Sequence, residues 1–204
     1  MAGGEHGAVP KQLIQYRVFI ASPSGLNEER KRFREKLDKF TAVHAEPLGV
    51  IFHPVGWEET VGGVGRPQQL INEDLKECDY AVFVLHDRWG SPPGSSSYTS
   101  GVEEEWAITE RLYQENKIRN VALFFKDVAP GQKQDPGDQL KSVLTFKKKI
   151  EDGKNYLFNP YSTTEQFAEA LEGHLAKWLR DHQRLPRVRR ALSRQIGLPS
   201  VAQS

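Results

Sequence analysis

The segment DYAVFVLHDRWGSPPGSSSYTSGVEEEWAITERLY, residues 79–113, contains the pattern that decides the fold. It opens with an apolar run, Tyr80 to Leu85, which has the length and composition of a strand buried on both faces. A loop rich in glycine, proline and serine follows, and a helix with an acidic start begins near Ser100. A buried strand, a polar loop and such a helix are the parts from which α/β folds build ligand sites.

The same alternation continues on both sides of this segment. Apolar runs predict further strands at residues 16–21, 50–55, 121–125 and 156–158, and stretches with helical periodicity separate them. Because buried strands that alternate with amphipathic helices form parallel sheets, we expect a three-layer α/β fold with five parallel strands and helices on both faces. If the strands follow the flavodoxin-like order 2-1-3-4-5, the carboxyl ends of the first and third strands flank a ligand-binding crevice.

One domain accounts for most of the 204 residues. We place it at residues 14–182, after a flexible arm at 1–13 that has no periodicity. Residues 183–204 form a basic extension or linker, which we interpret as a solvated segment or a helical continuation rather than a tail that binds nucleic acid or lipid. Its arginines are Arg184, Arg187, Arg189, Arg190 and Arg194.

The composition argues against several classes of protein. The formal net charge of +1 gives no reason to expect a nucleic-acid partner, and no apolar run is long enough for a membrane span. The first ten residues lack the apolar segment of a signal peptide, so we expect a cytoplasmic protein. Cys78 is the single cysteine and the six histidines lack the spacing of metal ligands, so we expect no disulfide and no metal site.

Three consecutive glutamates open the helix that follows the polar loop. Ser100 and Glu103 have the spacing of a capping box, which accounts for Glu103 without any catalytic role. Glu105 lies at the border of the buried stripe, where burial would raise its pKa and the amides of the helix start would lower it. The residues alone leave Glu105 as either a satisfied structural carboxylate or a catalytic one, with Glu104 as the second candidate.

The loop at residues 86–94 carries groups that suit a nucleotide. The guanidinium of Arg88 matches phosphate oxygens, and the ring of Trp89 matches a base or a nicotinamide. Most such loops only connect two elements, but the position of this one before the acidic helix favours a site. Trp57, in the glycine-rich segment 56–65, could close over a ligand or could belong to an exposed loop.

Three segments together resemble a TIR-like family: FIASPSGLNEER at 19–30, RPQQLINEDLKECDYAVFVLHDRWGSPPG at 66–94 and SGVEEEW at 100–106. The pattern of that family is a strand ending in serines with a following Glu-Arg, a strand entering an Arg-aromatic-Gly-x-Pro loop, and a Ser-Gly-Thr-x-x-Glu helix start. The family occurs at the amino terminus of many multidomain STAND NTPases and repeat proteins and is related to nucleoside deoxyribosyltransferases. The resemblance covers residues 16–126, and Val102 stands where the pattern usually has threonine.

This resemblance implies a TIR-like, flavodoxin-like sheet and, in active relatives, cleavage of an N-glycosidic bond. The essential glutamate of the relatives maps onto Glu105, which would stabilise an oxocarbenium-like transition state. NAD would then be the substrate, with no further cofactor; serines would bind the ribose, Arg88 the phosphate, and Trp89 or Trp57 a ring. The expected substrate-binding residues are Ser22, Ser24, Trp57, Arg88, Trp89 and Ser91.

The resemblance implies an NAD-cleaving effector of prokaryotic antiphage immunity, activated by self-association or by a partner or downstream domain. A second interpretation is a nucleoside or nucleotide N-glycosidase or deoxyribosyltransferase. A third is a non-catalytic TIR-like interaction module. Val102, which removes a hydroxyl that could orient a substrate, and the arginine-rich end favour the third interpretation.

Overall fold

Five parallel strands form one sheet in the order β2-β1-β3-β4-β5. The computed structural model describes residues 11–56, 66–94 and 97–195, with side chains as far as Arg184. The observed order is the predicted flavodoxin-like one, so the chain reverses its direction of travel across the sheet between β1 and β3. The strands are β1 (Ile14–Ala21), β2 (Val50–Val55), β3 (Tyr80–Leu85), β4 (Asn120–Lys126) and β5 (Phe158–Tyr161).

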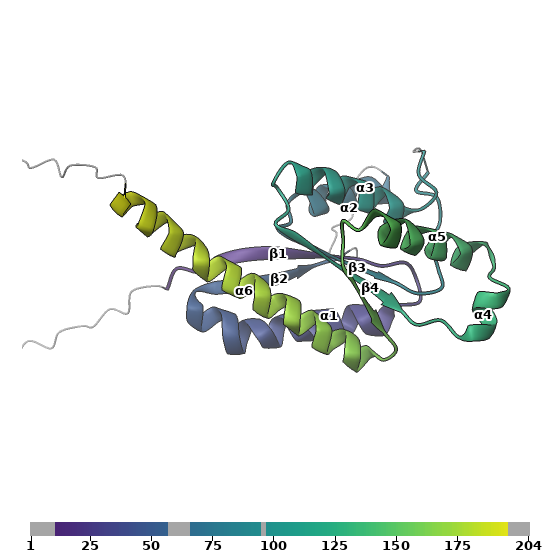
Figure 1. The fold of residues 1–204 in the computed structure, drawn as a ribbon, viewed down its shortest axis with the longest axis horizontal. Helices are drawn as coiled ribbons and strands as arrows, with labels where there is room; N and C mark the ends of the chain where they lie inside the picture. Colours follow the sequence, from purple (N-terminus) through teal and green to yellow (C-terminus); the bar gives the residue numbers. More distant parts are fainter. Residues whose placement is uncertain (1–10, 57–65, 95–96, 196–204) are drawn as a thin grey trace, which may run out of the picture.

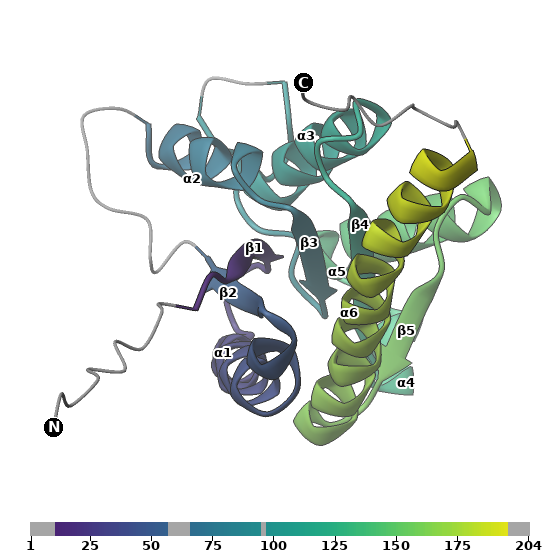
Figure 2. The ribbon, with the colours of Figure 1, turned by 90° about the vertical axis from the view of Figure 1, so that its left-hand side faces the viewer.

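Helices cover both faces of the sheet, which confirms the predicted three layers (Figure 1). Helices α1 and α6 lie side by side on one face, as Figure 2 shows, and α2, α3 and α5 cover the other. Two short turns, one π-helical (Thr41–Ala45) and one 3-10 (Glu46–Leu48), lead from α1 to β2. The helices are α1 (Asn27–Phe40), α2 (Pro67–Lys76), α3 (Gly101–Gln114), α4 (Pro130–Gln134), α5 (Asp138–Gly153) and α6 (Thr164–Gln195).

Alternate residues of each strand enter two separate cores. In β3, Val82 and Val84 pack toward α1 and α6, whereas Phe83 and Leu85 pack toward α2, α3 and α5. All six residues of β3 are buried, which is why its sequence is apolar without interruption. The buried run of β3 therefore ends at Leu85, and the polar loop that follows lies at the carboxyl edge of the sheet.

Helix α6 packs on the sheet through an apolar stripe that runs from Phe167 to Leu179 and includes Trp178. The indole of Trp178 stacks on the ring of Tyr80, with 4.2 Å between ring centroids and an interplanar angle of 13°. The helix does not stop at the predicted boundary, residue 182, but continues to Gln195 and projects from the domain (Figure 1). Among the described helices, none combines the length and the apolar character that a membrane crossing requires.

The last strand differs in position from the predicted one. β5 begins at Phe158 and pairs with β4 from Leu123 onward, whereas the prediction placed a strand at 156–158. Leu157 is 93% exposed, so its apolar side chain belongs to the preceding turn and not to the sheet. β5 is an edge strand and tolerates Pro160, just as β2, at the opposite edge, tolerates Pro54. A prediction from the apolar residues alone therefore starts this strand two residues too early.

Two leucines test how much of the stability comes from the α6 core. Leu171 is fully buried between α6 and the sheet, whereas Leu157 is almost fully exposed. We expect Leu171→Ala to lower the free energy of unfolding by about 2–5 kcal/mol, because it removes buried methyl groups and leaves a cavity. Leu157→Ala, the matched control, should change it by less than about 0.5 kcal/mol in urea denaturation. Equal losses in the two variants would contradict this packing.

Candidate functional site

A cavity of about 280 Å³ lies at the carboxyl ends of β1 and β3. Its walls come from the loop after β1, the loop after β3, helix α2 and the first turns of α3. Four of the residues predicted to form a site line this one cavity, although they come from three separate parts of the chain. They are Ser22, Ser24, Ser91 and Glu105.

The start of α3 is held by the serine half of the predicted capping box. The buried Ser100 is the N-cap residue, and its Oγ accepts a hydrogen bond of 3.1 Å from the backbone N–H of Glu103. In a complete capping box the carboxylate of Glu103 accepts from the backbone N–H of the N-cap residue, whereas here it accepts from the backbone N–H and the hydroxyl of Thr99, one residue earlier, both at 2.6 Å. Glu103 therefore has a structural role, and it fixes the turn that carries the next two glutamates.

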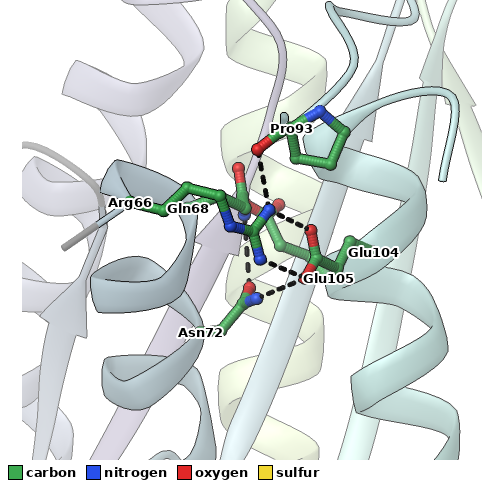
Figure 3. A network of polar contacts seen from close by, with 6 residues as sticks. All are labelled: Arg66, Gln68, Asn72, Pro93, Glu104 and Glu105. Carbon is green, nitrogen blue, oxygen red and sulfur yellow. Dashed lines mark hydrogen bonds and ion pairs between the residues drawn. The ribbon is translucent and has the colours of Figure 1, made fainter. Parts of the chain in front are cut away.

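Glu104 is also structural, because an arginine neutralises it. Arg66 donates two hydrogen bonds to its carboxylate, at 2.8 and 3.0 Å, and Asn72 donates a third at 2.9 Å (Figure 3). Arg66 also donates to the carbonyl oxygen of Pro93 at 2.8 Å. This arrangement joins α2, α3 and the β3–α3 loop, and the hydrogen bond to Glu104 raises the pKa of Arg66 above its ordinary value.

Glu105 is the glutamate that faces the cavity. Its side chain is buried, with 7% of the residue exposed, and its Oε1 accepts a hydrogen bond of 2.8 Å from Nε2 of Gln68. Within the described part of the chain, its Oε2 has no hydrogen-bond partner. Burial raises the pKa of Glu105 from its ordinary 4.5 to about 7; the charge of Glu104 adds to this increase and the bond from Gln68 opposes it. Such a pKa suits a carboxyl that takes part in chemistry near neutral pH.

A buried arginine on α1 stabilises the loop after β1. Arg30 donates hydrogen bonds to Oγ of Ser22 at 3.0 Å and to the carbonyl of Pro23 at 3.3 Å, and it also contacts Asn27. Because Ser22 accepts from Arg30, its own hydroxyl proton remains available to a ligand. Arg30 belongs to the Glu-Arg pair of the segment 19–30, but its sequence position alone predicts no role in the site.

The loop after β3 is held by Gln139, on α5. The side-chain oxygen of Gln139 accepts from the backbone N–H groups of Trp89 at 2.8 Å and Gly90 at 2.9 Å, and its amide donates to the Gly90 carbonyl at 3.1 Å. Gly90 has a φ of +100°, which favours glycine, and a Cβ there would meet Ser100 at 3.6 Å and Pro23 at 3.9 Å. The two loops therefore lie close together at Gly90, a proximity that no local sequence pattern predicts.

The remaining predicted residues do not line this cavity. Trp89 is buried, packs against Phe146 with 5.3 Å between ring centroids, and donates its indole N–H to Thr99 at 2.8 Å. Its ring lines a different hollow, between α3 and α5, so it does not offer a stacking face to a ligand beside Glu105. Arg88 is exposed, with its side chain beside Gly25. Trp57 lies outside the described residues.

The described residues contain no group of three or more histidine, cysteine, aspartate or glutamate side chains that could hold a metal ion. The polar side chains that line the cavity are three serines, Gln68 and Glu105, and its apolar lining includes Phe19, Ile71 and Val102. Hydroxyls and a carboxyl can bind a polar ligand such as a sugar, and the apolar side chains can contact a ring.

The sheet order and the cavity at the β1/β3 edge define a flavodoxin-like α/β domain with a ligand-sized site. The sequence profile of the family described as "Domain of unknown function (DUF4062)" matches residues 17–176, so the chain belongs to that family. One similar solved structure is the apo form of translation elongation factor SelB from Methanococcus maripaludis, with a TM-score of 0.43 and 12% identity. The match covers 83% of this chain and 35% of that one, and comparison with curated proteins found no match.

The raised pKa of Glu105 predicts a pH-dependent stability. A carboxyl whose pKa rises on folding stabilises the fold when protonated, and this contribution is complete below pH 4.5 and lost as the pH rises through about 7. Glu105→Gln resembles the protonated state at every pH. We therefore expect the variant to be more stable than the wild type by up to about 3 kcal/mol at pH 8, and nearly equal at pH 4.5, in denaturant unfolding.

Glu104→Gln is the matched control for this measurement. It removes the charge of a buried carboxylate that accepts hydrogen bonds from Arg66 and Asn72, so we expect it to lower the free energy of unfolding at pH 8 by about 1–3 kcal/mol. The two adjacent substitutions should thus have opposite signs. Destabilisation by both at pH 8 would contradict the different environments of the two carboxylates.

Proposed function

We propose that this domain is an N-glycosidase that cleaves the bond between ribose and nicotinamide in NAD, with Glu105 as the catalytic carboxylate. The observation that supports the proposal is the position of Glu105: it has one carboxylate oxygen held by Gln68 and the other free, at the edge of the cavity that three serines also line. Its neighbours Glu103 and Glu104 are occupied by a helix cap and an ion pair. A single carboxylate therefore remains for chemistry.

The size and walls of the cavity suit one end of NAD. Its volume of about 280 Å³ lies near the lower limit of ligand pockets, roughly 300 Å³, so it encloses a ribose and its attached ring rather than a whole dinucleotide. Val102 makes the ring side apolar where a threonine would offer a hydroxyl. Arg88 is exposed and lies beside Gly25 in the loop after β1, and we expect its guanidinium to bind a phosphate outside the cavity.

The reaction requires only this carboxylate and water. The bond between C1′ of the ribose and the ring nitrogen breaks, and its electron pair leaves with nicotinamide, which departs as a neutral molecule without protonation. The positive charge that develops at C1′ lies against Glu105, which stabilises it or forms a transient ester with it. Water then adds to C1′ and loses a proton, so the products are ADP-ribose, nicotinamide and one proton.

The charge of the substrate favours the reactive form of Glu105. A pKa of about 7 leaves much of this carboxyl protonated at neutral pH. The nicotinamide ring of NAD is positively charged, and a cation beside a carboxyl lowers its pKa. Binding of NAD would therefore ionise Glu105, whereas a neutral nucleoside would not.

We group the domain with the TIR-like proteins related to nucleoside deoxyribosyltransferases, because of the resemblance over residues 16–126. On that grouping, its biological role is depletion of NAD as an effector of prokaryotic antiphage immunity, switched on by self-association or by a partner or downstream domain. On this proposal, the part of α6 beyond residue 182 connects the domain to such a partner or downstream domain.

The pKa of Glu105 also supports a second candidate, a nucleoside N-glycosidase or deoxyribosyltransferase. A neutral nucleoside base leaves more readily when it is protonated, and a carboxyl with a pKa of about 7 still holds a proton to donate at neutral pH. The products separate the two candidates. NAD cleavage releases nicotinamide and ADP-ribose, whereas the second activity releases or exchanges a purine or pyrimidine base.

The test is nicotinamide release from NAD by the concentrated protein, with a crowding agent to favour assembly. We expect release by the wild type and at least a hundredfold loss, in the range of ~10²–10⁴, in Glu105→Gln. Glu73→Gln, an exposed glutamate on α2, should retain full activity.

Release that persists in Glu105→Gln would move the catalytic role to another residue. No release from NAD, together with base release from a panel of nucleosides, would establish the second candidate. No release from either would leave the third interpretation, a module that binds a partner, and such a module would be indifferent to Glu105→Gln.

A further inference from the structure

We infer that Gln68 is a positioning residue of this site: its carboxamide holds one oxygen of the Glu105 carboxylate and thereby orients the other toward the cavity. The inference rests on the proposed function for its consequence in catalysis, but its geometry stands independently. Gln68 lies in the first turn of α2, directly opposite the first turns of α3, and it lines the same cavity as Glu105.

The orientation of the Gln68 amide follows from the network around it (Figure 3). Glu104 is a carboxylate paired with Arg66, so it can only accept, and Asn72 must turn its NH₂ group toward it at 2.9 Å. Asn72 therefore presents its oxygen to Gln68, which must turn its own NH₂ group toward Asn72, at 3.2 Å. The same Nε2 carries a second hydrogen, and this one points to Oε1 of Glu105, at 2.8 Å.

Both hydrogens of the Gln68 amide are thus assigned, and the chain of bonds runs from Arg66 to Glu105. Because Oε1 of Glu105 is engaged by Gln68, Oε2 is the oxygen left for the substrate. The charged group that acts directly on Glu105 is Glu104, on the same helix; Gln68, the donor from α2, is neutral. Gln68 therefore both orients the carboxylate and favours its ionised form.

Gly101 explains how the Gln68 side chain reaches this position. A Cβ at residue 101 would collide with the side-chain oxygen of Gln68, which lies against the glycine. The glycine has ordinary helical geometry, so it is needed here for space and not for an unusual φ. The Ser-Gly pair at the start of α3 therefore has two functions, because Ser100 caps the helix and Gly101 admits the amide that holds Glu105.

The test is to titrate the Glu105 carboxyl and to monitor it by NMR, in protein labelled with ¹³C on its glutamate carboxyls. The Glu105 signal is assigned by its loss in Glu105→Gln. Gln68→Leu removes the donor, so we expect the titration midpoint of Glu105 in this variant to lie about one to two pH units above that in the wild type. Gln68→Lys supplies a charged donor and should lower the midpoint. Gln69→Leu, the same change at the exposed neighbouring position, should leave the midpoint unchanged.

Turnover gives the second readout. In Gln68→Leu, we expect kcat for nicotinamide release to fall by about tenfold or more, with KM changed by less than about twofold, because the variant misplaces the reacting oxygen rather than removing binding contacts. Gly101→Ala should move the midpoint in the same direction as Gln68→Leu while leaving the helix intact, since alanine is a good helix former. Gly101→Ala therefore tests the role of Gln68 even if Gln68→Leu does not fold.

An unchanged midpoint in Gln68→Leu and Gly101→Ala would overturn the inference, as would a shift of the same sign in Gln68→Leu and Gln68→Lys. A normal kcat in a variant with a shifted midpoint would also overturn the positioning role. A wild type that releases no nicotinamide would overturn the proposed function alone, because the titration involves no substrate.

Discussion

The ion pair between Arg66 and Glu104 is the interaction on which the geometry of the site depends. It is bidentate and largely buried, and the same guanidinium binds the carbonyl of Pro93, so one side chain fixes α2, α3 and the loop between β3 and α3. Successive residues of a helix point about 100° apart. Once Glu104 is directed to Arg66, Glu105 must face the cavity, and the difference between the two adjacent carboxylates follows from that rotation.

The two loops of the site are supported from opposite layers of the domain. Arg30, on α1, holds the loop after β1, and Gln139, on α5, holds the loop after β3. Glu29, adjacent to Arg30, is buried and paired with Lys126 at the end of β4, so the support of the first loop extends across the sheet. Because α1 and α5 cover opposite faces of the sheet, the geometry of the two loops depends on the packing of both helical layers.

Features that depend on local sequence or on strand order can be predicted for this chain. The flavodoxin-like order predicts that the loops after β1 and β3 face each other, and in the structure Ser22, Ser24, Ser91 and Glu105 line one cavity there. Trp89 was predicted to be a ligand-binding ring, whereas the structure buries it against Phe146, since a loop sequence does not reveal which side chains turn inward. Trp57, outside the described residues, stays a prediction.

The succession of strands and helices, the buried character of β3 and the Ser100 cap of α3 can be predicted from the sequence, because periodicity and capping depend on residues within a few positions of one another. Which of the three consecutive glutamates faces the cavity without an arginine partner can be seen only in the folded protein. That choice depends on Arg66, Gln68 and Asn72, which lie more than thirty residues away in the sequence and reach α3 only because α2 packs beside it. A partner brought by packing leaves no periodic signal along the chain, so its effect on a carboxyl becomes visible only in the folded protein.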